Sequence, residues 1–381
     1  MNFRLLALYL LLLPIAVFLA AGPNFLHVLF GLKAAGSLVA NLVLLGLGML
    51  LITHGGDLFT DSAVDVARVT RVPPVIIGAT IVSMATTFPE FMVSLTGALR
   101  GHPDFAVGNA LGSCCCNIGL IIGSCALING YLAPRRGTQT GIPASRLTLR
   151  GPGAFMLTAG VAVWAFSLFD NAGLVDNNGN TVPFAITRWQ AGVLVVLLVA
   201  YLGYSLRTAL QARFAEVTRA EAEADQEAER RIIQIVVLFA VGAGLVVVGS
   251  KLLVENSVQI AFAMGVPKLI VGLTVLAIGT SLPEFTISLL AVLKGHGALG
   301  IGNIIGANVL NICWVVATCA LINPLPIQWQ TVVLDGPVVL LLMTLLIGLA
   351  WKNERFSMRS GAVLIAVYAL YYVFMFAFFV K

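Results

Sequence analysis

Two glutamates lie inside long apolar stretches of the sequence and are the first candidates for chemistry. Glu90 is the only carboxylate in the run from 74 to 99, and Glu284 is the only carboxylate in the run from 269 to 293. Each follows a proline, which has no N–H to donate and clashes with the preceding helical turn. A helix broken at this proline would leave backbone carbonyl oxygens free beside the carboxylate.

Hydroxyl groups precede both carboxylates. Thr86 and Thr87 lie just before the first glutamate, and Thr280 and Ser281 lie just before the second. Each segment therefore offers a carboxylate, two hydroxyls and loosened carbonyl oxygens. Hard cations such as Ca²⁺ and Na⁺ prefer this all-oxygen ligand set.

A purely structural role is the alternative for each glutamate. A carboxylate at the centre of a bilayer costs about 2.5–3.5 kcal/mol even on the lenient insertion scale, so a structural one would need a basic partner. No Lys or Arg lies within the ten apolar runs given below, away from their ends. An ion or a proton is the expected counter-charge, and this favours a functional role.

The composition places these glutamates in a membrane protein. Of 381 residues, 59% are hydrophobic and only 10% are charged, whereas about 25% of the residues of a soluble domain are charged. This excludes a soluble cytosolic enzyme. The net charge of +5 is attributed to the sidedness of membrane loops, and no nucleic-acid partner is expected. The six cysteines all lie in apolar stretches and are expected to be reduced.

Apolar runs long enough to cross a bilayer, about 20 residues each, define the predicted fold. It is an all-α integral membrane protein with ten core transmembrane helices. The runs lie near 36–54, 74–99, 105–130, 152–170, 189–206, 232–250, 269–293, 299–323, 336–351 and 360–380. The predicted organisation is a first five-helix repeat over 36–206, a charged linker over 207–231 and a second five-helix repeat over 232–381.

Residues 1–35 contain an eleventh apolar run, Leu5 to Ala21, behind the basic Arg4. This run is either an extra transmembrane helix or a signal sequence. Small residues at −1 and −3 require cleavage after Gly22, which would leave a proline at the new N-terminus, so an uncleaved helix is favoured. Because Lys and Arg accumulate on the cytoplasmic side, the loop charges place the linker in the cytoplasm of a cell carrying this protein in its plasma or bacterial inner membrane.

The sequence repeats itself at a constant offset of 194 residues. Pro89-Glu90-Phe91 recurs as Pro283-Glu284-Phe285, and the register holds without gaps to Cys125–Asn129 and its copy Cys319–Asn323. Because each unit has five spans, an odd number, the second copy enters the membrane from the opposite side. A site shared between inverted repeats lies near the bilayer midplane and suits alternating access, which favours a transporter over a channel.

The third helix of each half carries a second polar motif. Gly108-Asn109-Ala110-Leu111-Gly112-Ser113 precedes Asn117, and Gly302-Asn303-Ile304-Ile305-Gly306-Ala307-Asn308 precedes Asn311. Small residues allow close helix approach, and packing is the favoured role for the glycines alone. The amides of Asn117 and Asn311 need partners when buried, and each carbonyl oxygen can serve a cation.

These two motifs together resemble the sodium/calcium exchangers of the calcium/cation antiporter superfamily, whose repeats read approximately G-T-S-x-P-E and G-N-x-x-G-S-N-x-x-[ND]. The resemblance implies inverted five-helix halves and a diamond of ion sites formed by their second and third helices. It implies the following ligands: the carboxylates of Glu90 and Glu284, backbone oxygens of Thr86 and Thr280, hydroxyls of Thr87 and Ser281, the central group Asn117, Asn311 and Ser113, and carbonyls of Ser83 and Ala277.

Three positions depart from the family pattern. Thr87 keeps the hydroxyl of the first Ser, Ala307 loses one, and Cys114 replaces an Asn whose second-copy partner Asn308 is present. The two halves of the site are therefore expected to differ. The resemblance also implies K⁺ independence, because potassium-dependent relatives carry Asp where this chain has Asn311.

The predicted function is secondary antiport of Na⁺ and Ca²⁺, electrogenic by family expectation, with a H⁺/Ca²⁺ exchanger using the same glutamates as the alternative. No cofactor is expected, and a monomer is the working expectation for the assembly. An ion channel and a membrane-embedded hydrolase are disfavoured; the sequence has no G-x-S-x-G or HExxH signature.

Two further features concern the first helix of each half. By resemblance, the helices at 36–54 and 232–250 would slide together against the core, with Gly46, Gly48, Gly242 and Gly244 suited to close contact. Asp57, Asp61 and Asp65, spaced four apart, share one helix face, for which a solvated surface is favoured over cation recruitment.

Overall fold

The computed structural model describes residues 38–99, 104–137, 139–168, 170–175, 181–217, 226–264 and 277–379. Nine helices within these ranges are long and apolar enough to cross a membrane, and a shorter apolar helix covers Leu282–Leu293. The predicted all-α membrane fold is confirmed. The extra helix or signal sequence predicted for residues 1–35 lies outside the described residues.

The first half contains five helical segments, several of them built from more than one helix. They are α3 (Leu38–Thr70); α4 (Pro74–Ile77), the π-helical turn η1 (Gly78–Val82) and α5 (Ser83–Leu99); α6 (Asp104–Cys115), the π-helical turn η2 (Cys116–Ile122) and α7 (Gly123–Leu132), followed by the 3-10 turn η3 (Pro134–Arg136); α8 (Arg146–Arg150) and α9 (Pro152–Ser167); and α10 (Arg188–Val217).

The second half repeats this plan. Its elements are α11 (Gln226–Ala263); α13 (Ala277–Thr280) and α14 (Leu282–Leu293); α15 (Gly297–Leu310), the π-helical turn η5 (Asn311–Val316) and α16 (Ala317–Ile322); the π-helical turn η6 (Thr331–Asp335) and α17 (Gly336–Trp351); and α18 (Met358–Phe378). Helices α10 and α11 both extend into the range predicted as a linker.

Short antiparallel strands join the two halves outside the helices. Strand β1 (Ile142–Pro143) pairs with β5 (Arg355–Phe356), with Ile142 opposite Phe356. The hairpin of β2 (Asp170–Val175) and β3 (Thr181–Ile186) adds β4 (Leu325–Pro326) through β3. The apolar pattern of the sequence does not predict these strands.

The third helices form the centre of the core. Every residue of α15 from Leu299 to Leu310 is buried. This helix approaches η1 so closely that a Cβ on Gly302 would lie 2.3 Å from the Val75 carbonyl oxygen, and one on Gly78 would lie 2.3 Å from the Leu299 carbonyl oxygen. These two positions therefore require glycine, and the approach brings the second helix of one half against the third helix of the other.

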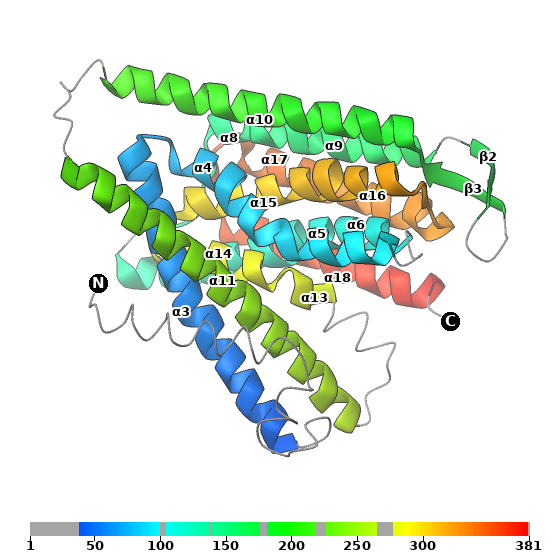
Figure 1. The fold of residues 1–381 in the computed structure, drawn as a ribbon, viewed down its shortest axis with the longest axis horizontal. Helices are drawn as coiled ribbons and strands as arrows, with labels where there is room; N and C mark the ends of the chain where they lie inside the picture. Colours follow the sequence, from blue (N-terminus) through cyan, green and yellow to red (C-terminus); the bar gives the residue numbers. More distant parts are fainter. Residues whose placement is uncertain are drawn as a thin grey trace.

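Helices α3 and α11 run together obliquely across the other helices (Figure 1). They are in contact through glycines. A Cβ on Gly48 would lie 2.9 Å from the Gly249 carbonyl oxygen, and a Cβ on Gly242 would lie 2.9 Å from the Gly55 carbonyl oxygen. The pairing is reciprocal, because Gly48 and Gly55 correspond to Gly242 and Gly249 at the repeat offset of 194. We refer to α3 and α11 as the helix pair.

Two predictions for the helix pair need correction. Around Gly46 no described atom lies within 4 Å of an added Cβ, so its predicted close contact is wrong. The contacts of Gly48 and Gly242 join α3 to α11 rather than either helix to the core. Helix α3 also continues to Thr70, well past the predicted end at 54, because the aspartates of its second part occupy one polar face of a continuous helix.

Candidate functional site

Glu90 on α5 and Glu284 on α14 are both fully buried. Thr87, three residues before Glu90, donates its hydroxyl to Glu284 Oε1 at 3.4 Å. The carboxylates of the two halves therefore share one site.

The two prolines act differently on their helices. Helix α5 continues through Pro89, so the predicted break at this residue is wrong in the first half. In the second half the chain is interrupted at Ser281, and Pro283 lies in the first turn of α14. Both prolines nevertheless lack an N–H, so the carbonyl four residues earlier loses its helical partner.

Crosswise packing brings the third helices to the carboxylates. Helix α5 packs against η5, and α14 packs against η2. Turn η5 starts at Asn311, and Asn117 is the second residue of η2. A π-helical turn widens the helix and is frequent at functional sites. Both amides thus lie on a distorted turn beside the opposite half's carboxylate helix, a distortion that the apolar pattern does not reveal.

Buried polar atoms without a hydrogen-bond partner gather at this site. Of the twelve such side-chain atoms in the described part of the chain, eight belong to predicted ligands. They are Glu90 Oε1 and Oε2, Glu284 Oε2, Ser113 Oγ, Ser281 Oγ, Asn117 Oδ1, and Asn311 Oδ1 and Nδ2. An unsatisfied buried polar atom costs about 1–3 kcal/mol, so their concentration in one place indicates a site built for a polar occupant. Seven of the eight are oxygens, which suits a hard cation.

A third buried carboxylate, that of Asp335, differs from Glu90 in having hydrogen-bond donors around it. Asp335 accepts hydrogen bonds from Gln330, Thr331 and Tyr371 at 3.1–3.3 Å. A carboxylate in this protein can therefore be satisfied by neutral donors when its place is structural. Within the described residues Glu90 has no such donor on either oxygen.

The remaining predicted ligands, Ser83, Thr86, Ala277 and Thr280, lie in the residues that precede the two glutamates in the sequence. The Thr86 hydroxyl has two acceptors for its single O–H, the Ser83 carbonyl oxygen at 3.2 Å and Asn303 Oδ1 at 3.1 Å, and Ser83 donates its own hydroxyl to the Thr80 carbonyl oxygen. Thr280 and Ala277 are the last and first residues of α13, immediately before Ser281. The side chain of Ala277 lies outside the description.

Two asparagines that the sequence analysis treats only as part of a motif anchor the second helices. Asn109 Nδ2 donates to Ser94 Oγ at 2.9 Å, and its repeat counterpart Asn303 donates to Ser288 Oγ at 3.2 Å. Asn109 also reaches the Glu90 carbonyl oxygen at 3.4 Å. Both members of each bond recur at the offset of 194, which is the sequence signal that could have identified them.

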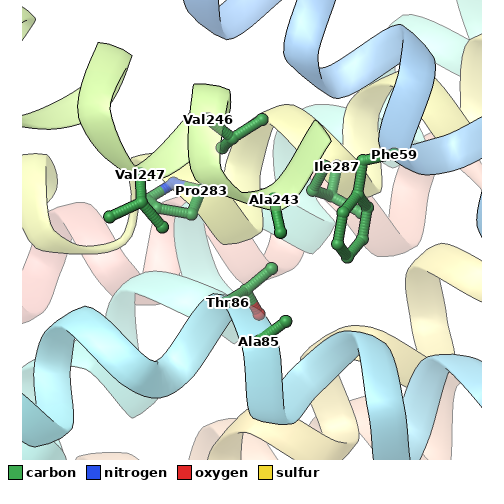
Figure 2. A pocket seen from close by; sticks show the side chains of 8 residues that line it. All are labelled: Phe59, Ala85, Thr86, Ala243, Val246, Val247, Pro283 and Ile287. Carbon is green, nitrogen blue, oxygen red and sulfur yellow. The ribbon is translucent and has the colours of Figure 1, made fainter. Parts of the chain in front are cut away.

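The helix pair covers this site with apolar side chains. Phe59 of α3 and three residues of α11, Ala243, Val246 and Val247, line a pocket with Ala85, Thr86, Pro283 and Ile287 (Figure 2). Thr86 is the only polar residue of this lining, and its hydroxyl is already bonded to Asn303 and Ser83. The lining between the helix pair and helices α5 and α14 is therefore apolar apart from Thr86.

One polar contact ties the helix pair to the core. Lys294, which follows α14, lies 2.9 Å from Asp57 Oδ1 and 2.8 Å from Asp61 Oδ1 on α3. Desolvation lowers the pKa of Lys294, but its hydrogen bonds to the two aspartates outweigh this, so the pKa is raised. Asp65 pairs with Arg68 at 3.4 Å. The three aspartate side chains remain 43–63% exposed, so the favoured solvated face is confirmed, and each aspartate also forms an ion pair there.

Known proteins share both the sequence pattern and this architecture. The family model described as sodium/calcium exchanger protein matches residues 40–207 and 234–377. The inner membrane protein YrbG of Escherichia coli is 32% identical over 84% of this chain and 92% of its own length. The sodium/calcium exchanger MaX1 of Methanosarcina acetivorans is 24% identical over 89% of this chain and 99% of its own length.

The fold is also similar to that of a solved exchanger. A structure of the sodium-calcium exchanger NCX_Mj matches with a TM-score of 0.72 at 25% identity, covering 88% of this chain and 99% of that one. Family, relative and structure agree over both halves and over the helices that carry the buried carboxylates. The chain therefore belongs to the sodium/calcium exchanger protein family and is a multi-pass membrane antiporter of cations including Ca²⁺.

Proposed function

We propose that this antiporter exchanges Na⁺ for Ca²⁺ by alternating access. The observation that carries the proposal is the group of buried, unpartnered oxygens around Glu90 and Glu284. Two carboxylates neutralise one Ca²⁺, and the hydroxyl and amide oxygens around them supply the further ligands that a hard cation needs. The gradient of one ion then drives the other, and no covalent step is required.

The proposed ligands fall into two groups. Side-chain oxygens come from Glu90, Glu284, Thr87, Ser281, Ser113, Asn117 and Asn311, and backbone carbonyl oxygens come from Thr86, Thr280, Ser83 and Ala277. The Thr86 hydroxyl donates within the protein, toward Asn303 and Ser83, and its backbone carbonyl oxygen is the proposed ligand by resemblance to the family motif.

Alternating access would come from movement of the helix pair over the core. The apolar surface between Val246 or Ala243 on one side and Ala85 on the other has no hydrogen bonds to break when the pair slides. The inverted repeat makes the site look alike from both faces, so one movement would open it to each face in turn.

We further propose, from the family resemblance, that the exchange is electrogenic and independent of K⁺. More than two Na⁺ beside two carboxylates would leave surplus positive charge in a poorly hydrated site, so each cycle with more than two Na⁺ would move net charge. Asn311 brings no third carboxylate for K⁺. The loop charges favour a plasma or bacterial inner membrane with residues 207–231 in the cytoplasm.

Radiolabelled Ca²⁺ uptake into proteoliposomes tests the proposal. Vesicles are loaded with Na⁺ and diluted into Na⁺-free buffer, with K⁺ present or absent and with valinomycin to set the voltage. We expect uptake that requires the outward Na⁺ gradient, ignores K⁺ as a substrate and responds to voltage. Absence of Na⁺-driven uptake by a correctly folded, reconstituted protein would contradict the proposal.

A H⁺/Ca²⁺ exchanger is the alternative that the same site allows. Glu90 has both carboxylate oxygens free of partners among the described residues, and such a group can carry a proton. Uptake driven by a pH gradient alone, with equal Na⁺ on both sides, would establish this alternative and keep the two glutamates as the carriers.

A further inference from the structure

Cys114 and Asn308 occupy equivalent positions in the two repeats, at the offset of 194. Each lies three residues before a proposed amide ligand, Asn117 in the first half and Asn311 in the second. All four side chains are almost completely buried. The two halves of the site thus differ by one side chain at the same place.

The contact of Asn308 crosses from one half to the other. Asn117 Nδ2 donates to Asn308 Oδ1 at 3.1 Å, and Asn308 Nδ2 in turn faces Met156 Sδ at 3.6 Å. Because the nitrogen and oxygen of an amide point in opposite directions, a bond to Nδ2 turns Oδ1 of Asn117 away from Asn308. This Oδ1 is one of the unpartnered oxygens of the site.

Among the described residues, Asn311 has no hydrogen bond equivalent to that of Asn117 with Asn308. Asn311 has no partner on either Oδ1 or Nδ2. Cys114 points its thiol at the backbone carbonyl oxygen of Asn308, with Sγ 3.8 Å from it. A thiol sulfur is a weak acceptor, so Cys114 cannot hold the Asn311 amide as Asn308 holds that of Asn117.

We infer that Asn308 is a positioning residue that turns the Asn117 carbonyl oxygen toward the cation, and that Cys114 leaves the Asn311 amide without this anchor. The inference rests on the proposed cation exchange and deepens it, because it identifies which half of the site carries a preoriented amide. An amide fixed before binding loses less rotamer freedom when the ion arrives than one that must be ordered on arrival.

Substituting the residue of one repeat at the equivalent position of the other makes the two halves of the site alike, and this can be done in two ways. Asn308→Cys gives both halves a cysteine and leaves Asn117 Nδ2 without its acceptor. Cys114→Asn gives both halves an asparagine and supplies an acceptor for Asn311 Nδ2. Cysteine and asparagine are similar in size, so neither change opens a large cavity in the core.

The test measures the Ca²⁺ KM and the maximal rate of exchange in proteoliposomes, together with Ca²⁺ affinity by calorimetry on the purified protein. We expect Asn308→Cys to raise the Ca²⁺ KM and Kd about tenfold, the effect of one buried hydrogen bond, while the maximal rate changes little. Cys114→Asn should lower both constants by severalfold. Cys125→Ser, a buried cysteine substitution elsewhere on the same transmembrane segment, serves as the control with unchanged constants.

A merely structural role for Asn308 would lower the yield of folded protein and the maximal rate without changing the Ca²⁺ Kd, and this outcome would overturn the inference. So would equal Ca²⁺ affinity in Asn308→Cys and the unmodified chain. Failure of the proposed function would look different, because the unmodified chain would then show no exchange driven by Na⁺ or H⁺ in the same assay.

Discussion

The ion-site segments, which are α5, α14, η2 and η5, and the helix pair come from the same duplicated sequence but differ in the charge that they bury. Segments α5, α14, η2 and η5 bury two carboxylates and leave most of the site's oxygens without protein partners. The helix pair buries no charged side chain in its described part and is held together by glycine contacts and a small apolar cluster around Leu51 and Leu245. One region is costly without an occupant, whereas the other is held together mainly by backbone approach and apolar contacts.

This difference fits the proposal that the protein keeps a polar site in its core and a moving helix pair in one membrane. In the proposed mechanism the unpartnered polar atoms gain their partners from the ion, so they do not tie the core to the helix pair. Across the pocket between them, Ala85 and Thr86 meet Ala243 and Val246 (Figure 2), and no hydrogen bond crosses this lining in the described residues. The comparison predicts that removing charge from the core weakens Ca²⁺ binding, whereas adding volume between the paired helices destabilises their packing.

The largest effect is expected from neutralising the core carboxylates. Glu90→Gln and Glu284→Gln each keep the shape of the side chain but remove one of the two negative charges facing the cation. Removing one partner of a buried charge pair costs about 3–5 kcal/mol, which corresponds to a loss of Ca²⁺ affinity of at least about a hundredfold. Uptake in proteoliposomes and calorimetric Ca²⁺ titration measure the loss.

Glu255→Gln is the matched control for this charge. Glu255 lies exposed on the helix pair, 3.9 Å from Lys251. Its substitution should leave Ca²⁺ affinity within a factor of two or so, as expected for a surface pair. Full exchange by either Glu90→Gln or Glu284→Gln in normally inserted protein would remove the core carboxylates from the mechanism.

Joining the pair to the core should stop transport. Ala85→Cys on α5 and Ala243→Cys on α11 place two thiols in the lining of one pocket. A short bifunctional thiol reagent that links them should reduce Ca²⁺ uptake to background, because the pair can no longer slide. The native cysteines are free and buried, so each single variant treated alike is the control. Normal uptake by the linked protein would show that the pair does not move against α5.

Filling the glycine contact should destabilise the helix pair. The Cβ of Gly48→Val would lie 2.9 Å from the Gly249 carbonyl oxygen, and backbone cannot move aside as a side chain can. Overpacking of this kind costs about 1–3 kcal/mol, which a lower Tm in detergent would show. Gly46→Val, on the same helix, meets no described atom and should leave the Tm nearly unchanged. Equal Tm values for the two variants would contradict the close contact.

The sequence allows much of the fold and of the site to be predicted because both depend on patterns that survive duplication. The apolar runs predict the spans, and the repeated Thr-(Thr/Ser)-x-Pro-Glu segments single out Glu90 and Glu284. The reciprocal pairs Gly48–Gly249 and Gly55–Gly242 were available at the same offset, but Gly55 lies beyond the predicted end of its helix at residue 54. An apolar window stops where the first polar residues appear, although the helix continues.

Other features depend on contacts that no linear pattern contains. The π-helical turn at Asn311 and the crosswise bond from Asn117 to Asn308 arise from packing between the halves. Pro89 lies within a continuous helix, whereas Pro283 follows an interruption, although their sequence contexts match. Asp335 lies just outside the predicted run of 336–351, and Tyr371, the one of its three donors that is distant in sequence, reaches it only when α18 folds against it.

The smallest effect is expected at Lys294, the polar exception to the apolar boundary between pair and core. Lys294→Met removes the contacts to Asp57 and Asp61. The Lys294 side chain is 27% exposed, so the loss of unfolding free energy should be only about 0.2–1 kcal/mol. Because the pKa of Lys294 is raised in the folded protein, this stabilisation is fully present below the ordinary lysine pKa of 10.5 and is lost as the pH rises through the folded value. The difference in unfolding free energy between Lys294→Met and the unmodified chain should therefore be constant from neutral pH to pH 9 and vanish in more alkaline solution. Lys352→Met, in an exposed turn, is the control for the loss of one lysine charge.

The equivalents of Asp57 and Asp61 in the second repeat are Lys251 and Glu255, which pair with each other, so ion pairing of Lys294 with two aspartates is specific to the first half. A destabilisation that persisted unchanged above the lysine pKa would mean that Lys294 acts through its aliphatic stem, and the boundary would then be apolar here as well.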